Sequence, residues 1–212
     1  MLKILKPYLF NMGFDALIIG GGVSGLQCAL VLGSAKNKAF VIDRKIGIIV
    51  HQKASHLQNA LFNNVLGLPE KTIGKNLLIE GRQQLSSLYT AISQIENEKV
   101  IAVTDTVGGY MVRTNKNTYT SKIVIIALNY AKPFLIKGLD AFIEPHKKAN
   151  PEKARIQLKN KDSFIKKGMY CCGTIAGCRS QFSIAAGSGA AVATDILTLW
   201  NNGNHVKVHD KI

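Results

Sequence analysis

The chain has few cysteines, and no two of them have the spacing that dithiol or zinc chemistry uses. Its 212 residues contain four, Cys28, Cys171, Cys172 and Cys178, and no Cys-x-x-Cys occurs. This absence excludes a thioredoxin-type dithiol and a zinc knuckle. Cys28 falls in an expected helix as a small core residue, and the adjacent Cys171 and Cys172 are expected as buried thiols. This cysteine usage indicates the cytoplasm.

Acidic residues, arginine and aromatic residues are also scarce. The chain has 13 Asp and Glu but 27 Lys and Arg, of which only five are Arg, and its net charge is +14. Proteins that read nucleic acids use arginine at base edges and aromatic rings for stacking, so we expect no nucleic-acid partner. Residues 132–167 carry ten Lys and Arg against four Asp and Glu. That run is either a solvated face or a docking patch for an acidic partner.

Long apolar runs are missing as well. No uninterrupted stretch approaches the roughly 20 residues of a membrane span, so we expect no membrane contact. Lys6 and Pro7 interrupt the first residues, which therefore do not form a secretory signal. Apolar residues still make up 47% of the chain, enough for a packed core. We expect one domain over residues 1–212, with 1–12 as an extension ahead of the first strand.

Apolar strands and a helix alternate at the start of the chain. Residues 16–20 predict a buried strand, 23–35 a helix and 39–43 a second buried strand. Two buried strands joined by a helix form a right-handed parallel βαβ unit. Residues 44–75 are expected as a loop with a short helix, and 76–94 as an amphipathic helix.

The second half predicts strands before a final helix. Three strands separated by hairpin turns are expected between residues 99 and 126, and the last, fully apolar, should return to the parallel sheet. A short strand at 155–158 and a buried strand at 168–173 follow. Residues 181–200 predict a long helix whose glycines and alanines allow close backbone approach, and the tail after it is expected to be extended.

A glycine turn carries the first chemical signal. Gly20, Gly22 and Gly25 form Gly-x-Gly-x-x-Gly between the first strand and the first helix. This pattern provides a tight turn, close approach to a pyrophosphate and close helix–strand packing, with helix N–H groups directed at the phosphates. Asp43 ends the expected second strand, where an acid hydrogen-bonds an adenosine ribose. The acid favours NAD or FAD over NADP, and a ligand-free βα turn is the alternative.

Beyond this turn, four segments resemble the flavin-binding half of the thioredoxin reductase-like FAD-dependent oxidoreductases (the pyridine nucleotide-disulphide oxidoreductase family). They are DALIIGGGVSGLQCAL, NNVLGLPEKTIGKNLL, SKIVIIALNYAKP and GMYCCGTIAGCRSQFSIAAGSGAAVATDIL, in the family's order. The last segment is the most specific, because its small residues match the spacing of the family's small residues along a whole helix. The resemblance implies an α/β fold, a Rossmann-like FAD-binding domain with a parallel central sheet and an inserted antiparallel β-meander.

The departures from the family matter as much. The family's Gly-Asp is Gly173-Thr174 here, and its Ala-Thr-Gly is Ala127-Leu128-Asn129. In the family a nicotinamide domain, with the Cys-x-x-Cys of thioredoxin reductase, lies between those two segments. Residues 130–167 fill that interval here, and they are too few for a domain and contain no Gly-x-Gly. Thioredoxin reduction by the usual route is therefore not expected.

The resemblance and the glycine turn together give a set of expected FAD contacts. Asn64 would lie near the flavin ring. The start of the helix after Gln181, capped by Ser180 and assisted by Arg179, would direct N–H groups at the N1/O2 edge of the flavin and stabilise its reduced, anionic form. The expected cofactor-binding residues are Gly20, Gly22, Val23, Ser24, Gly25, Asp43, Arg44, Asn64, Ile101, Ala127, Gly173, Thr174, Gln181 and Phe182.

Catalytic and metal-binding candidates are weak. His56 lies in a loop expected near the flavin, where a surface or capping role is the alternative. Cys172, or Cys178, is a candidate thiol beside the flavin. His205 and His209 have helical metal-ligand spacing, but the alternating valines around them predict an extended chain in which they lie roughly 13 Å apart. We expect no metal site.

The leading hypothesis is an FAD-binding oxidoreductase related to thioredoxin reductase. Without a nicotinamide domain, its electrons would come from free NAD(P)H or from a partner, and residues 132–167 would dock an acidic electron-carrier protein. A homodimer is also expected. The alternatives are a non-enzymatic or subunit-type FAD-binding module that has lost turnover, and a colourless NAD-binding dehydrogenase.

Overall fold

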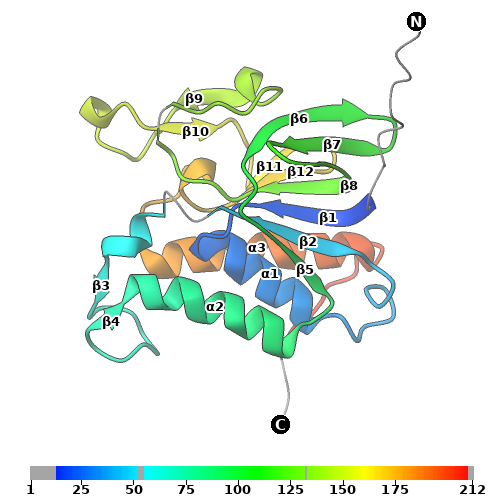
Figure 1. Ribbon diagram of the computed structural model, residues 1–212, viewed down its shortest axis with the longest axis horizontal. Coiled ribbons are helices and arrows are strands. Elements are labelled where there is room, and N and C mark those ends of the chain that lie inside the picture. Colours follow the sequence, from blue (N-terminus) through cyan, green and yellow to red (C-terminus); the bar gives the residue numbers. More distant parts are fainter. Residues whose placement is uncertain (1–12, 52–54, 132, 210–212) are drawn as a thin grey trace, which may run out of the picture.

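A computed structural model of the chain describes residues 13–51, 55–131 and 133–209. Figure 1 shows three layers: a central, mainly parallel sheet, helices on one face, and smaller strands on the other. The expected extension at residues 1–12 lies outside the described residues.

The central sheet has the strand order β11-β12-β8-β1-β2-β5. Neighbouring strands from β12 to β5 are parallel, and β11 joins the edge in the antiparallel sense. The strands are β1 (Gly13–Ile19), β2 (Ile46–Val50), β5 (Ile92–Glu96), β8 (Thr118–Ile126), β11 (Phe164–Lys166) and β12 (Met169–Cys171). This arrangement confirms the expected α/β class with its parallel sheet.

An antiparallel meander is joined to the sheet through β8. The hairpin of β6 (Val100–Thr106) and β7 (Gly109–Thr114) precedes it. Residues 118–121 of β8 pair with β7, whereas 124–126 pair with β12 in the parallel sense. One strand therefore belongs to both the meander and the parallel sheet, which confirms the expected insertion.

Two small sheets and four short 3₁₀ helices complete the connections within the described ranges. The small sheets pair β3 (Leu61–Phe62) with β4 (Thr72–Ile73) and β9 (Ile143–Pro145) with β10 (Ile156–Leu158). The 3₁₀ helices are η2 (His56–Asn59), η3 (Asp140–Phe142), η4 (Pro151–Lys153) and η5 (Gly173–Ala176). Strand β10 agrees with the strand expected at 155–158.

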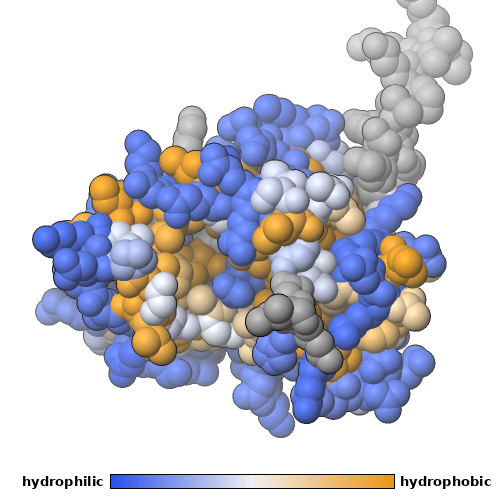
Figure 2. All heavy atoms as spheres, turned by 90° about the horizontal axis from the view of Figure 1, so that it is seen from below, coloured by the Kyte–Doolittle hydropathy of each residue, from blue (hydrophilic) through white to orange (hydrophobic). Residues whose placement is uncertain are grey.

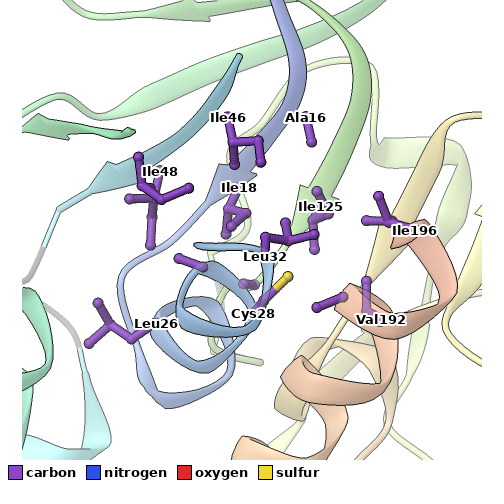
Figure 3. Packing of buried hydrophobic residues seen from close by; sticks show 14 of the residues in the cluster. Ala16, Ile18, Leu26, Cys28, Leu32, Ile46, Ile48, Ile125, Val192 and Ile196 are labelled. Atoms are coloured by element: carbon purple, nitrogen blue, oxygen red, sulfur yellow. The ribbon is translucent and has the colours of Figure 1, made fainter. Parts of the chain in front are cut away.

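Three helices cover one face of the sheet: α1 (Val23–Ser34), α2 (Gly74–Leu88) and α3 (Phe182–Trp200). Figure 3 shows Ile18, Ile48 and Ile125 of the sheet directed toward α1 and α3. Gly189 of α3 lies so close to α1 that an added Cβ would stand 2.0 Å from the Ser24 carbonyl oxygen. The small residues of α3 thus allow the close backbone approach expected from its composition.

The opposite face of the sheet carries a second core. Leu17, Ile19 and Val124 point away from the helices and pack with Val112 of the meander and Ile156 of β10. Strands covered on both faces are continuous apolar runs, as in β1 and the second half of β8. The segment 133–167 is therefore held against the sheet by its own buried side chains.

The second parallel strand is not where the sequence pattern placed it. Residues 39–43 form turns, and the strand is β2, fully buried over Ile46–Val50. Lys36 stabilises the turns, since its Nζ donates to the carbonyl oxygens of Ile42 and Arg44 at 3.1 and 2.8 Å. Gly47 weakens the strand signal of β2, but an added Cβ there would stand 2.6 Å from the Phe14 ring. The glycine leaves room for that ring.

The helix expected over 76–94 ends at Leu88, and Ile92–Glu96 forms the edge strand β5. Leu85, Leu88 and Ile92 have helical spacing, yet Leu88 is exposed while Ile92 is buried against β2. Pairing with β2 outweighs local helical periodicity here.

Helix α3 bears on the expectation about membrane spans. Among the residues with described positions, this 19-residue helix alone is long and apolar enough to cross a membrane by length and composition. Val192, Ile196 and Leu197 bury one face of it in the core, so it is also typical of a core helix. Figure 2 views the helical face, where apolar atoms gather toward the end that carries β3 and β4; Leu61 and Ile73 are exposed there.

Candidate functional site

A cavity of about 490 Å³ opens at the carboxyl ends of the parallel strands. It is bounded by the glycine turn after β1, by Ala127 after β8 and by the start of α3. Ligands of open α/β sheets bind at this end of the strands, and the volume falls within the roughly 300–1,000 Å³ of ligand pockets. The fold therefore places the glycine turn and the α3 start around one cavity.

The three fingerprint glycines have different surroundings. Gly20 has φ +119°, and an added Cβ would stand 2.4 Å from the Ala127 carbonyl oxygen. At Gly25 it would stand 1.9 Å from the Gly20 carbonyl oxygen, so Gly25 permits the close contact of α1 with the turn. At Gly22 it would meet nothing within 4 Å. Gly22 therefore leaves open a space at the cavity wall that a side chain would fill.

The N-terminus of α1 adjoins that space. Gly22 is the N-cap, no side chain caps the helix, and its first turn has no acidic residue. The first N–H groups of a helix have no partner within it, and they carry the positive end of the helix dipole. The wall formed by Gly22, Val23 and Ser24 is thus suited to an anionic group.

The start of α3 closes the far end of the cavity. Gln181, not Ser180, caps this helix: its Oε1 accepts a hydrogen bond from the Ile184 N–H at 2.9 Å. Phe182 contacts Phe62 of β3 edge-on, with ring centroids 5.2 Å apart. Gln181, Phe182 and Thr174 all line the cavity. The expected contacts at both ends of the cofactor therefore share one space.

Most of the expected contact residues are brought together, and some are not. Gly20, Gly22, Val23, Ser24, Ala127, Thr174, Gln181 and Phe182 line the cavity. Gly25 and Gly173 lie just behind its wall; the Gly173 N–H donates to Ser188 Oγ at 3.0 Å. Asn64 is exposed in a turn outside the lining, and Val100 lines the cavity where Ile101 was expected.

The ribose role expected for Asp43, with Arg44 beside it, is wrong. Both residues precede β2, at the amino ends of the strands and opposite the cavity. Arg44 instead forms an ion pair with Asp15 at 3.4 Å and lies over the Trp200 ring. Because the pattern put the strand at 39–43, it put the acid at the wrong end of the sheet. The argument from Asp43 for NAD or FAD over NADP fails with it.

The residue that follows β2 is His51, which lines the cavity together with Lys99 and Glu98. The carboxylate of Glu98 accepts hydrogen bonds from Thr114 Oγ1, Asn117 Nδ2 and Tyr119 Oη at 2.6, 2.6 and 2.9 Å. Burial raises the pKa of Glu98, but these hydrogen bonds outweigh it and lower the pKa below 4.5. Glu98 is therefore a buried, engaged carboxylate.

Several lining residues were not expected from the sequence. They are Ile49, His51, Ser55, Leu57, Ala60, Phe62, Glu98, Lys99, Leu128, Asn129, Ala131, Pro133, Phe134, Leu135, Ile136 and Ala185, besides Val100 and Ser180. A usable signal existed for His51, because the apolar run 46–50 ends at it. Many of the others come from loops, which carry no comparable periodicity, and the rest, such as Ile49 of β2 and Ala185 of α3, lie in elements whose pattern does not show which side chains face the cavity.

Solved structures of similar shape point to one fold. A thioredoxin reductase from Gloeobacter violaceus aligns with a TM-score of 0.68 and 14% identity over 94% of this chain and 99% of the other. The chain has a thioredoxin reductase-like fold. Two further solved structures share this fold. A ferredoxin-flavin thioredoxin reductase from Clostridium acetobutylicum aligns with a TM-score of 0.66 and 16% identity over 90% of this chain and 98% of the other. An oxidoreductase from Agrobacterium tumefaciens aligns with a TM-score of 0.66 and 14% identity over 89% of this chain and 99% of the other.

No protein-family model and no curated protein matches the chain. The thioredoxin reductase-like fold is therefore recognised from structure, and the structural neighbours are oxidoreductases.

Within this thioredoxin reductase-like fold, the thiol candidates are poorly placed for catalysis. Cys172 is fully buried in the helical core, and burial raises the pKa of its thiol to about 12. Cys178 is half-buried and lies outside the cavity lining. All four cysteines are free thiols. The side chain of His56 lies outside the described part, and no cluster of metal-ligating side chains, His205 and His209 included, occurs among the described residues.

Proposed function

We propose that the chain is an FAD-binding flavoprotein oxidoreductase related to thioredoxin reductase. The observation that carries the proposal is the open space at Gly22, beside the uncapped start of α1, in a cavity that extends to Gln181 and Phe182. Bound FAD would supply the electron transfer, which side chains alone do not provide. The fold of the neighbours supports an oxidoreductase role.

The lining residues fit most of an FAD molecule. Gly20, Gly22 and Ser24 would hold the pyrophosphate through backbone N–H groups, and Gln181 and Phe182 would adjoin the ring. The positive end of α3 would favour negative charge on that part of the flavin. Towards the adenosine, His51 stands at the end of β2, where an acid was expected, and Lys99 lines the same cavity, so the ribose would be bound without a carboxylate at the end of β2.

We also propose that reductant comes from outside the chain. Residues 130–167, where the resemblance places a nicotinamide domain, form the β9–β10 hairpin and strand β11 on the second core. Free NAD(P)H or a partner protein would then deliver electrons to the open side of the cavity. A cytoplasmic location and a homodimer remain part of this proposal.

The decisive experiment is the visible spectrum of the purified protein, with FAD added if none co-purifies, followed by anaerobic titration with NADH and NADPH. We expect stoichiometric FAD with absorbance near 450 nm that is bleached on reduction. A protein that stays colourless and takes up no FAD contradicts the proposal.

A non-enzymatic FAD-binding module is the second candidate. The buried Cys172 thiol and the engaged Glu98 carboxylate favour it, because neither is available for proton or thiol chemistry in the cavity. Protein that binds FAD but resists reduction by NADH, NADPH and acidic carrier proteins would support this candidate over the first.

A further inference from the structure

A second, smaller cavity of about 160 Å³ lies beside the first. Its walls come from Tyr130 after β8, from the loop after β9, from the end of η4, and from residues 178–180 ahead of α3. Its volume suits a small ligand, since a water molecule takes about 30 Å³. Ser180 lines both cavities, so whatever occupies the second cavity lies next to the first.

His146 belongs to the lining of this cavity and carries a buried ring donor. The residue is 7% exposed and lines the cavity. Its Nδ1 accepts a hydrogen bond from the Lys148 N–H at 3.1 Å, which assigns the proton of the neutral ring to Nε2. Nε2 is buried and has no hydrogen-bond partner among the residues that the structure describes. A buried donor left unpaired costs free energy, so a ligand acceptor would relieve that cost.

Arg155 adds a second such donor. Its Nε is also buried and unpartnered, and its guanidinium lies 5.0 Å from the centre of the Tyr130 ring. The backbone N–H of His146 donates to the backbone carbonyl oxygen of Arg155 at 3.0 Å, which fixes the two residues opposite one another. The fold thus holds two unpartnered donors on adjacent backbone segments.

Positive charge surrounds the pair. Lys148, Lys153 and Arg179 complete the basic lining, and no acidic side chain belongs to it. In the described part of the chain, no ion pair engages these three residues or Arg155. The nearest acid in sequence, Glu152, is exposed and hydrogen-bonds Asn150. Four cations therefore line a space to which the described residues contribute no carboxylate, and two of the lining residues carry unpartnered donors.

We propose that this second cavity binds the phosphate group of a small phosphorylated ligand, held by His146 Nε2, Arg155 and Arg179. A phosphate offers more acceptor oxygens than a carboxylate and carries up to two charges, so it suits several donors from different sides. The phosphate would sit beside the α3 end of the first cavity. This inference does not require that the first cavity bind FAD.

The test is isothermal titration of the purified chain with inorganic phosphate, and with sulfate, succinate and chloride at matched ionic strength. We expect saturable phosphate binding that is at least tenfold tighter than succinate binding. Arg155→Gln and the exposed Arg179→Gln should each weaken it about tenfold or more, as expected for loss of a charge-assisted hydrogen bond. Lys161→Gln removes one exposed charge of the same segment outside the cavity, and it should leave the affinity within twofold.

A second readout guards against variants that fail to fold. In the wild-type chain, the ¹⁵N resonance of His146 Nε2 should shift during the phosphate titration and stay unchanged with chloride. The proposal is overturned if succinate or chloride binds as tightly as phosphate, if Lys161→Gln loses as much affinity as Arg179→Gln, or if the His146 resonance does not respond.

Discussion

At the scale of single residues, the three glycines of the turn are not equivalent. Gly20 and Gly25 are enclosed by backbone, and a methyl group at either would collide with a carbonyl oxygen. Gly22 alone has free space beside it, with φ −77°, which any residue adopts. A substitution at Gly22 therefore tests ligand contact without testing the fold.

We predict that Gly22→Ala weakens FAD binding by roughly tenfold or more, about 1.4 kcal/mol, while the melting temperature of the protein without added FAD stays close to wild type. The methyl group would take the space into which we place the pyrophosphate. Fluorescence titration with FAD measures the affinity, and thermal denaturation checks the fold.

Two variants serve as controls for Gly22→Ala. Gly187→Ala adds a methyl group to α3, where nothing lies within 4 Å, and Asp43→Asn removes the acid at the opposite end of the sheet. Both should bind FAD within twofold of wild type. A loss at Asp43 equal to that at Gly22 would restore the ribose role that the fold denies to Asp43.

At the scale of elements, the sequence predicts the parts whose pattern is local. Helix α1, the meander and α3 follow from periodicity, glycine turns and hairpin signals, and the structure confirms them. Strands β2 and β5 could not be predicted from the sequence. Gly47 interrupts the apolar run of β2, and Ile92 of β5 has helical spacing from Leu85, so the pattern predicts a helix there. Only tertiary contacts, the Phe14 ring and the β2–β5 pairing, decide these two strands.

The same distinction explains the candidate site. The glycine turn and the α3 start are tied to local motifs, and most of their residues were identified correctly as neighbours. Asp43 was misplaced because its position depends on which of two apolar runs forms the strand. The residues of the second cavity come from the segments after β8 and β9, from the end of η4 and the residues after it, and from the segment ahead of α3, and no sequence period brings His146 to Arg155.

At the scale of elements, the hydrogen bonds between Glu98 and the meander make the stability of the fold depend on pH. Three hydrogen bonds hold the folded-state pKa of Glu98 below 4.5 although burial alone would raise it. A carboxyl group with a lowered pKa stabilises the fold at neutral pH, and this contribution is lost as the pH falls through the folded-state pKa. We predict that Glu98→Gln lowers the free energy of unfolding by about 1–3 kcal/mol at pH 7 and by progressively less as the pH falls through the folded-state pKa of Glu98.

Urea denaturation of both proteins at pH 7, 5, 4 and 3 measures this difference. Glu96→Gln is the control, since that carboxylate is half exposed and pairs only at 3.5 Å with Arg82; its effect should be small at every pH. A Glu98→Gln deficit that stays constant down to pH 3 would contradict the prediction.

At the scale of the whole molecule, charge is unevenly distributed. The chain carries a net charge of +14. Residues 132–167 have ten basic and four acidic residues and so contribute +6 of this net charge. Lys148, Lys153, Lys159 and Lys161 of this segment are exposed. Such a surface attracts acidic proteins and accelerates their association at low salt.

If an acidic carrier protein donates the electrons, the second-order rate of reduction should fall about tenfold or more between 10 and 200 mM salt, because salt screens exposed charges. Stopped-flow absorbance near 450 nm measures this rate. The double variant Lys159→Glu, Lys161→Glu should be slower at low salt, whereas Lys75→Glu, on the exposed surface of α2, should change it little. A rate insensitive to salt would exclude this dock.

Strand β8 has a consequence for how the protein loses its structure. It pairs with β1 along one edge, and along the other with β7 over its first residues and β12 over its last. Neither the hairpin nor the parallel part of the sheet can separate from the rest without breaking the pairing of the same nine-residue strand. The two halves should consequently melt in a single all-or-none transition, and the amide protons at the centre of β8 should be the slowest of the chain to exchange with solvent.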